Sequence, residues 1–341
     1  MKNETNMEEE FLAYYKSSYP DVTNVDLIVE EFCNITDGWE TEVFSIKLKS
    51  KSNTLPTTKR LILRIYPGQD AYAKSAREFH AMKKLHELEY PVPRVFLLER
   101  ENSPFNQPFV IMEYINGIIM GEKFNSHEVQ KKFVELFTKL HSLDYKAFVT
   151  NASSYKKDLV RLKLKNFHNV ISHYNRKEYL PVIDWFDHKS QSIITDRFSP
   201  IHYDFHPYNI LIRKEDKKPI VIDWGGFEIS DYRIDLAWTL LLVSTYERPH
   251  MRNVILKEYE RISGEGVDNI EFFEGLMALR RLFLIQASLI NGAEQHGMRS
   301  GAGEEMRKNI NHIKNVYSLF QDRTEMNIPE IEDLIGQVEN K

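Results

Sequence analysis

Hydrophobic and polar positions follow two different periods in the first third of the chain. The segment Arg60–Tyr66 reads RLILRIY, a short apolar run with a strand-like pattern. In the segment that follows, Asp70–Leu88, apolar residues recur every three or four positions, which predicts an amphipathic helix. We therefore expect a sheet into which one helix is inserted.

Four further segments complete the predicted sheet, and a short helix near Glu8–Lys16 precedes it. Pro91 and Pro93 end the inserted helix, because proline cannot continue the helical hydrogen bonding. Asp37-Gly38 is suited to a tight turn between the first two strands. The other four predicted strands are Val25–Ile35, Thr41–Lys49, Arg94–Glu99 and Phe109–Tyr114.

Helical spacing dominates from Ser126 onward and is clearest in Val129–Leu143 and Tyr232–Tyr246. Two short strands, Ile210–Arg213 and Pro219–Ile222, interrupt it. We expect an α+β fold of two lobes with a boundary near Asn116-Gly117. Residues 1–115 would form a small antiparallel five-stranded lobe with one inserted helix, and residues 116–341 a larger, mainly helical lobe.

The composition narrows the class of protein. The 341 residues are 42% hydrophobic and carry a net charge of −5, and the basic residues form no block, so we expect no nucleic-acid partner. The start of the chain is acidic and has no apolar signal region, and the longest apolar stretch, Leu236–Val243, is far shorter than the roughly 20 residues that span a bilayer. Cys33 is the only cysteine, which excludes an intramolecular disulfide. A cytoplasmic enzyme without a membrane partner is expected.

The chemistry concentrates in Ile201–Gly226. Asp204 precedes Asn209 by five residues, and Asp223 follows Asn209 by fourteen, across the predicted hairpin. Phosphoryl transfer needs an aligned nucleophile and metal ions that neutralise charge on phosphate oxygens. A carboxylate on a loop can align a hydroxyl and accept its proton. An amide oxygen and a second carboxylate are the hard ligands that Mg²⁺ prefers.

This segment resembles the catalytic loop and metal-binding motif of protein kinases, and more closely those of the aminoglycoside phosphotransferase and choline kinase-like family. The resemblance implies a protein kinase-like fold with a nucleotide-binding first lobe, Asp204 as the catalytic base, His206 beside the nucleotide, and Asn209 with Asp223 as Mg²⁺ ligands. Tyr203 and Tyr208 depart from it, since they stand where the family has glycines. The matching segments are HYDFHPYN at 202–209, DWG at 223–225, and DYRIDLA at 231–237, whose Asp235 is expected to be buried.

Other interpretations of these residues remain open. His202, Asp204 and His206 alternate, so on a strand they would share a face and resemble a transition-metal site of a hydrolase. Pro207 favours a loop, in which His202 braces the backbone and His206 packs or contacts phosphate. Asn209 taken alone is compatible with a turn and Asp223 with a strand-end cap.

The first lobe contains a matching pair of charges. Arg64 shares a strand face with Ile62, an unusual place for a surface charge, and Glu78 lies near the apolar side of the inserted helix. A kinase-like lobe uses a basic residue on its third strand to hold the nucleotide phosphates and an acidic residue on the next helix to orient it. We predict these roles for Arg64 and Glu78. The alternative places Arg64 at a sheet edge and pairs Glu78 with Lys74.

The remaining nucleotide contacts are predicted from order along the chain. The segment Phe109–Gly117 looks like the strand and hinge that read adenine, with backbone groups of Glu113 and Ile115 as partners. Gly38 lies in the hairpin that would cover the phosphates. The donor is expected to be ATP or GTP.

The acceptor is expected to be a small molecule. Only twelve positions separate Asp223 from Asp235, and no Ala-Pro-Glu occurs, so no room is left for the segment on which protein kinases bind peptides. We therefore predict transfer to a hydroxyl of a small molecule, such as an aminoglycoside or amino alcohol. An acidic stretch could attract a cationic acceptor or be a solvated helix face: Glu258, Glu260, Glu265, Asp268, Glu271 and Glu274. The competing function is an inactive nucleotide-binding regulator.

Overall fold

The computed structural model describes residues 4–18, 27–35, 41–50, 58–68, 70–149, 159–195, 197–292 and 302–339. These residues divide into two compact units. Unit 1 contains the described residues up to Ile118 together with Leu211–Gly225, and unit 2 contains Ile119–Ile210 and the described residues from Gly226 onward. The lobe boundary predicted after residue 115 stays a prediction.

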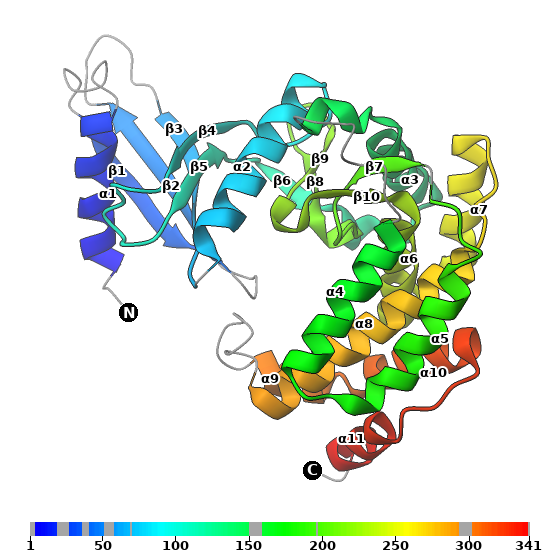
Figure 1. The fold of residues 1–341 in the computed structure, drawn as a ribbon. Helices are drawn as coiled ribbons and strands as arrows, with labels where there is room; N and C mark the ends of the chain where they lie inside the picture. Colours follow the sequence, from blue (N-terminus) through cyan, green and yellow to red (C-terminus); the bar gives the residue numbers. More distant parts are fainter. Residues whose placement is uncertain are drawn as a thin grey trace. The chain divides into compact units, whose positions relative to one another are not determined.

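Unit 1 is built on a five-stranded antiparallel sheet in the order β1-β2-β3-β5-β4, which confirms the predicted sheet (Figure 1). Strand β3 is central, because it pairs with β2 on one side and β5 on the other. The strands are β1 (Leu27–Asn34), β2 (Glu42–Ser50), β3 (Thr58–Ile65), β4 (Val95–Glu99) and β5 (Phe109–Glu113).

One face of this sheet packs against helix α1 (Glu4–Ser18). Phe11 of α1 is fully buried and belongs to the same apolar cluster as Leu61 and Leu63 of β3. Since side chains alternate along a strand, Ile62 and Arg64 belong to the opposite face. The apolar pattern of β3 therefore determines on which side of the sheet its arginine lies.

Helix α2 (Ala71–Glu87) contacts β4 and β5 and confirms the inserted helix. Leu88 is its C-cap residue and lies three residues before Pro91. Glu78 is fully buried on this helix. A second sheet has the order β6-β8-β9, with strands β6 (Gly117–Ile119), β8 (Ile210–Arg213) and β9 (Pro219–Val221). The two strands expected to interrupt the helical part are thus found as β8 and β9.

Unit 2 is mainly helical, as predicted. Helix α8 is long and apolar and packs against α6 and α10 (Figure 1). None of the helices in the described ranges combines the length and apolar character that a membrane crossing requires. The helices are α3 (His127–Ser142), α4 (Leu159–His173), α5 (Leu180–Ser190), α6 (Tyr232–Leu242), α7 (Met251–Ser263), α8 (Ile270–Asn291), α9 (Ala302–Lys308), α10 (Ile310–Thr324) and α11 (Pro329–Glu339).

Two features of unit 2 were not predicted. Strands β7 (Phe198–Ile201) and β10 (Glu228–Asp231) pair with each other on either side of the chemical segment. They are four residues long and contain Pro200 or two acidic residues, so no alternating pattern marks them. Helix α6 also ends earlier than expected, because the chain continues from Val243 as a single π-helical turn.

Candidate functional site

Arg64 lies between two acidic side chains in unit 1. Its Nη1 donates to Glu78 Oε1 at 2.9 Å, and its Nη2 donates to Asp223 Oδ1 at 2.7 Å. The alternative of an edge arginine with a local Glu78–Lys74 pair is wrong, since β3 is central and Glu78 binds Arg64. The structure thus brings together three of the residues that the sequence assigned to the nucleotide and the metal, Arg64, Glu78 and Asp223.

Two groups besides Arg64 donate hydrogen bonds to the Glu78 carboxylate. The Tyr66 hydroxyl donates to Glu78 Oε2 at 2.7 Å, and the backbone N–H of Trp224 also donates to this carboxylate. Burial raises the pKa of Glu78 above its ordinary value although Arg64 opposes the shift. Burial and the neighbouring Glu78 charge raise the pKa of the Tyr66 hydroxyl as well. The helix carboxylate is therefore fixed from three sides.

The cluster Arg64, Glu78 and Asp223 contains one cation and two carboxylates. Burial of Arg64 is more than offset by the two acids, which raise the pKa of its guanidinium. Its Nε is buried and has no hydrogen-bond partner in the described part of the chain. The cluster therefore combines an excess of negative charge with a buried donor that has no acceptor among the described residues.

Asp223 stands at the end of β9 in a left-handed conformation, with φ of 65°. Aspartate tolerates this conformation better than most residues. Trp224 behind it is fully buried and donates its indole N–H to Val221 O at 3.0 Å. Arg77 of α2 donates to Gly225 O at 2.8 Å. The buried tryptophan anchors the turn, while the side chain of Asp223 stays 44% exposed.

Asp204 is held by hydrogen bonds in unit 2. Trp238 Nε1 donates to Asp204 Oδ1 at 2.9 Å, and His206 Nε2 lies 3.5 Å from Oδ2. Burial by itself would raise the pKa of Asp204, but these donors lower it below its usual range. The carboxylate is therefore ionised at neutral pH. The Asp204 side chain is 47% exposed and is therefore accessible to a substrate.

Asn209 is oriented by the same loop. Its Nδ2 donates to the backbone oxygen of Asp204 at 3.0 Å and lies 3.4 Å from Asp204 Oδ2. Because the amide nitrogen is used in this way, the amide oxygen of Asn209 remains available as a ligand. Asp204 and Asn209 therefore lie close together on one loop of unit 2.

The loop around Asp204 is anchored from beneath by Asp235 of α6. Asp235 is fully buried, as the resemblance implies, and its two oxygens accept the backbone N–H groups of His202 and Tyr203, each at 2.8 Å. His141 Nε2 lies 3.3 Å from the same carboxylate. Burial lowers the pKa of His141 despite this acidic neighbour. One buried carboxylate thus fixes the two residues that precede Asp204.

The tyrosines that replace the family's glycines are both accommodated. Tyr203 adopts a φ of 69°, which is strained for a residue with a Cβ atom. Tyr208 lies against Gly121, where a Cβ would approach the Tyr208 ring to 2.9 Å. Residue 203 therefore adopts a left-handed backbone conformation that glycine would take with less strain than tyrosine.

The histidines of the loop do not form the transition-metal triad considered above. His202 is fully buried, and its Nδ1 accepts the backbone N–H of Asp204 at 3.3 Å. Among the described residues, no three His, Cys, Asp or Glu side chains are grouped so that they could hold a metal ion. His202 braces the loop, whereas the assignment of His206 to the nucleotide stays a prediction.

The two residues predicted to contact adenine through their backbone differ in their hydrogen bonds. The Glu113 N–H donates to Arg94 O at 2.8 Å, and the Glu113 side chain accepts the Arg94 N–H at 3.0 Å. The Ile115 N–H has no hydrogen-bond partner among the residues with a described position. Ile115 is therefore the better placed of the two to donate to a base. Gly38 lies outside the described residues.

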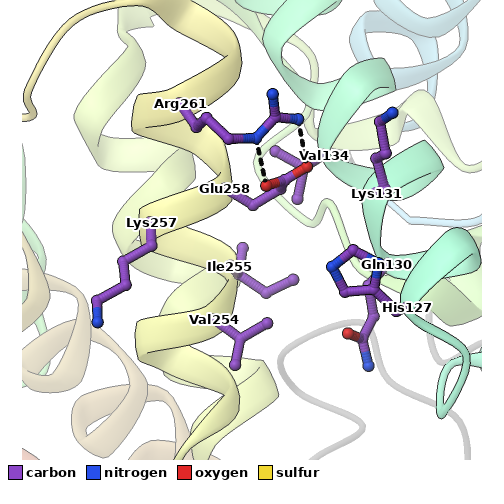
Figure 2. A pocket seen from close by; sticks show the side chains of 9 residues that line it. All are labelled: His127, Gln130, Lys131, Val134, Val254, Ile255, Lys257, Glu258 and Arg261. Atoms are coloured by element: carbon purple, nitrogen blue, oxygen red, sulfur yellow. Dashed lines mark hydrogen bonds and ion pairs between the residues drawn. The ribbon is translucent and has the colours of Figure 1, made fainter.

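A cavity of about 270 Å³ lies between α3 and α7 of unit 2 (Figure 2). Glu258 and Arg261 form an ion pair at its rim. None of the predicted site residues lines it. Its lining residues are His127, Gln130, Lys131, Val134, Val254, Ile255, Lys257, Glu258 and Arg261.

Sequence reasoning missed the aromatic residues that hold the acids. Trp238 contacts Asp204, and Tyr66 contacts Glu78, but both stand in apolar segments where an aromatic residue is ordinary. The only available signal for Trp238 is its place three residues after Asp235, one helical turn further along α6.

Comparison with known proteins gives one family match and two partial relatives. The model of the family described as "Phosphotransferase enzyme family" matches residues 31–273. Mouse acyl-CoA dehydrogenase family member 10 is 24% identical over 201 residues, which cover 54% of this chain and 18% of that protein. A LicA homolog of Metamycoplasma hominis is 27% identical over 128 residues, 37% of this chain and 47% of that protein. The chain thus spans less than half the length of either relative.

Solved structures share the fold at low identity. An ethanolamine kinase of Plasmodium vivax has a TM-score of 0.62 at 10% identity, covering 95% of this chain and 92% of that one. A choline kinase of Cryptosporidium parvum has a TM-score of 0.58 at 15% identity, with coverages of 97% and 99%. A GDP complex of an aminoglycoside 2′-phosphotransferase variant has a TM-score of 0.60 at 13% identity, with coverages of 93% and 99%.

Proposed function

This chain belongs to the phosphotransferase enzyme family, and we propose that it transfers the γ-phosphate of ATP or GTP to a hydroxyl of a small molecule. The predicted family and protein kinase-like fold are confirmed, and the family assigns the class of a small-molecule phosphotransferase. The names of the structural neighbours, an ethanolamine kinase and a choline kinase, support a hydroxyl acceptor. The GDP complex of a third neighbour supports keeping both purine nucleotides as donors.

The observation that carries the proposal is the position of Arg64 between Glu78 and Asp223. A guanidinium held at 2.9 Å and 2.7 Å by two carboxylates keeps a fixed orientation. Its buried Nε has no partner in the described part of the chain and fits a phosphate oxygen of the nucleotide. Arg64 would then hold the donor while Glu78 and Tyr66 keep the guanidinium in place.

The residues also fit Mg²⁺. The Arg64 cluster has one more negative charge than positive, and Asp223 and Asn209 supply the carboxylate and amide oxygens that this ion takes. Asp223 and Asn209 are therefore the residues that would hold it. When bound, Mg²⁺ supplies charge neutralisation at the phosphate oxygens.

Asp204 would act on the acceptor. Its lowered pKa keeps it ionised, and the Trp238 indole fixes one oxygen while the carboxylate stays partly exposed. An ionised carboxylate in this state can orient a hydroxyl and accept its proton as the phosphoryl group is transferred. Asp235 would serve this step indirectly, by fixing the loop that carries Asp204.

A coupled ADP- or GDP-release assay with Mg²⁺ and a panel of hydroxyl acceptors tests the proposal. We expect acceptor-dependent release that Asp204→Asn lowers by about 10²- to 10⁴-fold with little change in nucleotide affinity. Asp223→Ala should abolish release. Asp216→Asn is the matched control, because Asp216 lies at the β8–β9 turn in surface pairs with Arg213 and Lys218.

Two results would count against the proposal. Unchanged turnover in Asp204→Asn would remove the assigned base. Nucleotide binding without release for any acceptor would favour the inactive regulator, because the phosphate-binding cluster would then work without catalysis.

A further inference from the structure

Arg280 of α8 lies beside the proposed catalytic residue without an acidic partner. Its guanidinium carbon is 4.4 Å from the centre of the Tyr203 ring and 4.5 Å from the centre of the Trp238 ring. Tyr203 directly precedes Asp204, and Trp238 donates to the Asp204 carboxylate. The same indole therefore contacts both Asp204 and Arg280.

The guanidinium of Arg280 has unused donors. Its Nη1 is buried without a hydrogen-bond partner, and no carboxylate within the described ranges forms an ion pair with it. Stacking on aromatic rings occupies the faces of a guanidinium and leaves its N–H edge for acceptors. This edge matches the two oxygens of a carboxylate or of a phosphate group.

Several other charged residues of unit 2 form ion pairs, whereas Arg280 forms none with a described residue. Lys163, which also lies over the Tyr203 ring, forms an ion pair with Glu228. In the acidic stretch that was considered as an attractor for cationic acceptors, Glu274 is fully buried between Arg252 and Arg323. Two other acids of this stretch also bind arginines, Glu258 with Arg261 and Glu265 with Arg197.

We propose that the acceptor carries an oxyanion, a carboxylate or a phosphate, in addition to the hydroxyl that is phosphorylated, and that Arg280 binds this oxyanion. This inference rests on the proposed function. The unpaired cation at Trp238 favours an anionic acceptor over a cationic one, and three of the six acids of the acidic stretch are already neutralised by arginines. Arg280 would act as a specificity residue. It would bind the oxyanion of the acceptor while Asp204 contacts the hydroxyl of the same molecule.

Matched acceptors that differ only in the anionic group test the inference. The probes are glycerate and glycerol 3-phosphate against glycerol, gluconate against glucose, and choline and kanamycin as cations. We expect kcat/KM to be at least about tenfold higher for an anionic member than for its neutral counterpart. The carboxylate and phosphate probes separate the two sources of the oxyanion.

Substitution of Arg280 should remove this preference. Arg280→Gln is expected to lower kcat/KM for the anionic acceptor by about 10- to 100-fold, while the neutral acceptor and the nucleotide KM change little. Arg280→Lys should recover part of the loss, because it keeps the charge without the planar edge. Arg281→Gln is the control, since the neighbouring Arg281 binds Tyr246 and His312 instead.

The outcomes separate this inference from the proposed function. Turnover with neutral or cationic acceptors in preference to anionic ones, or an anion preference that survives in Arg280→Gln, overturns the inference alone. No turnover with any acceptor overturns the proposed function, and calorimetric titration with the anionic probes then decides the inference. Binding that Arg280→Gln weakens would support it, and absent or unchanged binding would refute it.

Discussion

The two units hold their acidic residues by different means. In unit 1, Arg64 joins Glu78 and Asp223 by ion pairs, so each carboxylate depends on one shared cation. In unit 2, Asp204 depends on an indole N–H, a histidine and a loop whose backbone is fixed by Asp235. The first arrangement is electrostatic, and the second consists mainly of hydrogen bonds and packing.

This difference agrees with the roles proposed for the two units. The cluster in unit 1 has excess negative charge and one donor without a partner among the described residues. Because its charges are only partly balanced, its side chains can change partners when a nucleotide and a metal ion bind. A carboxylate fixed by packed neighbours keeps its geometry throughout, which is what alignment of a hydroxyl needs. The comparison predicts that the units respond differently to the loss of a charge and to acid.

The largest effect on folding is expected from Arg64→Met. The substitution leaves Glu78 buried without its cation, and loss of one partner of a buried ion pair typically costs about 3–5 kcal/mol. Denaturant unfolding and hydrogen exchange in α2 would measure it, together with nucleotide affinity. Arg60→Met is the control, because Arg60 lies on the same strand but binds Glu31 at the surface. Equal losses in both variants would show that unit 1 does not depend on the shared cation.

Asp235→Asn tests the fixed loop of unit 2. An amide nitrogen cannot accept the second backbone N–H, so one donor at His202 or Tyr203 is left buried and unpaired, at a cost of about 1–3 kcal/mol. Thermal unfolding would report this loss, and acceptor turnover should fall while nucleotide affinity is kept. The exposed Asp184→Asn provides the comparison. Retained turnover would mean that Asp204 does not need this anchor.

Acid should destabilise unit 2 before unit 1. Burial and the neighbouring Arg281 lower the pKa of His312 to about 3, so the unfolded chain binds a proton between about pH 6.5 and 3 that the folded chain does not. Stability is therefore lost as pH falls, by about 2 kcal/mol at pH 5. The lowered pKa of Asp204 acts in the same direction, whereas the raised pKa of Glu78 in unit 1 gives stability that grows as pH falls.

The pH dependence of hydrogen exchange would separate these contributions. Protection of α10 should decrease between pH 7 and 5, and His312→Gln should flatten that slope. His188→Gln, at an exposed position on α5, should leave the slope as it is. A uniform loss of protection in both units would contradict the comparison.

The smallest effect is expected from Tyr66→Phe. It removes the hydroxyl that donates to Glu78 Oε2 at 2.7 Å, and loss of such a hydrogen bond costs about 1 kcal/mol. Nucleotide affinity should fall slightly, because Glu78 keeps Arg64 but loses one of its fixed donors. Tyr72→Phe on the exposed face of α2 serves as the control for the hydroxyl deletion. If both variants show the same nucleotide affinity and stability, the Tyr66 hydroxyl does not stabilise Glu78. Arg64 and the backbone N–H of Trp224 would then be its only supports among the described contacts.

The fold was predictable from local pattern where elements are long. The helical period of Asp70–Leu88 predicts α2, and the alternation around Arg64 predicts β3. A helix or strand that buries one face must place its apolar residues at the period of that element, whatever the sequence. Strands β7 and β10 were not predictable, since four residues with a proline or charges show no period. Their pairing depends on contacts between segments that lie far apart in the chain.

The sequence by itself determined the identities and spacing of the chemical groups. Asp204, Asn209 and Asp223 are recognisable because phosphoryl transfer needs a base and hard oxygen ligands, and few other chemistries need this set. The apolar pattern around Arg64 likewise predicted a buried charge that requires a partner.

Only the tertiary structure decided which neighbours hold these groups. Trp238 at Asp204, Tyr66 at Glu78, and the unpaired Arg280 between Tyr203 and Trp238 are products of packing between distant segments. The physical reason is that the sequence around an aromatic or charged residue does not indicate which distant residue it will contact. Its hydrogen bonds and stacking depend on distances of a few ångströms, which are fixed only when helices and strands pack together.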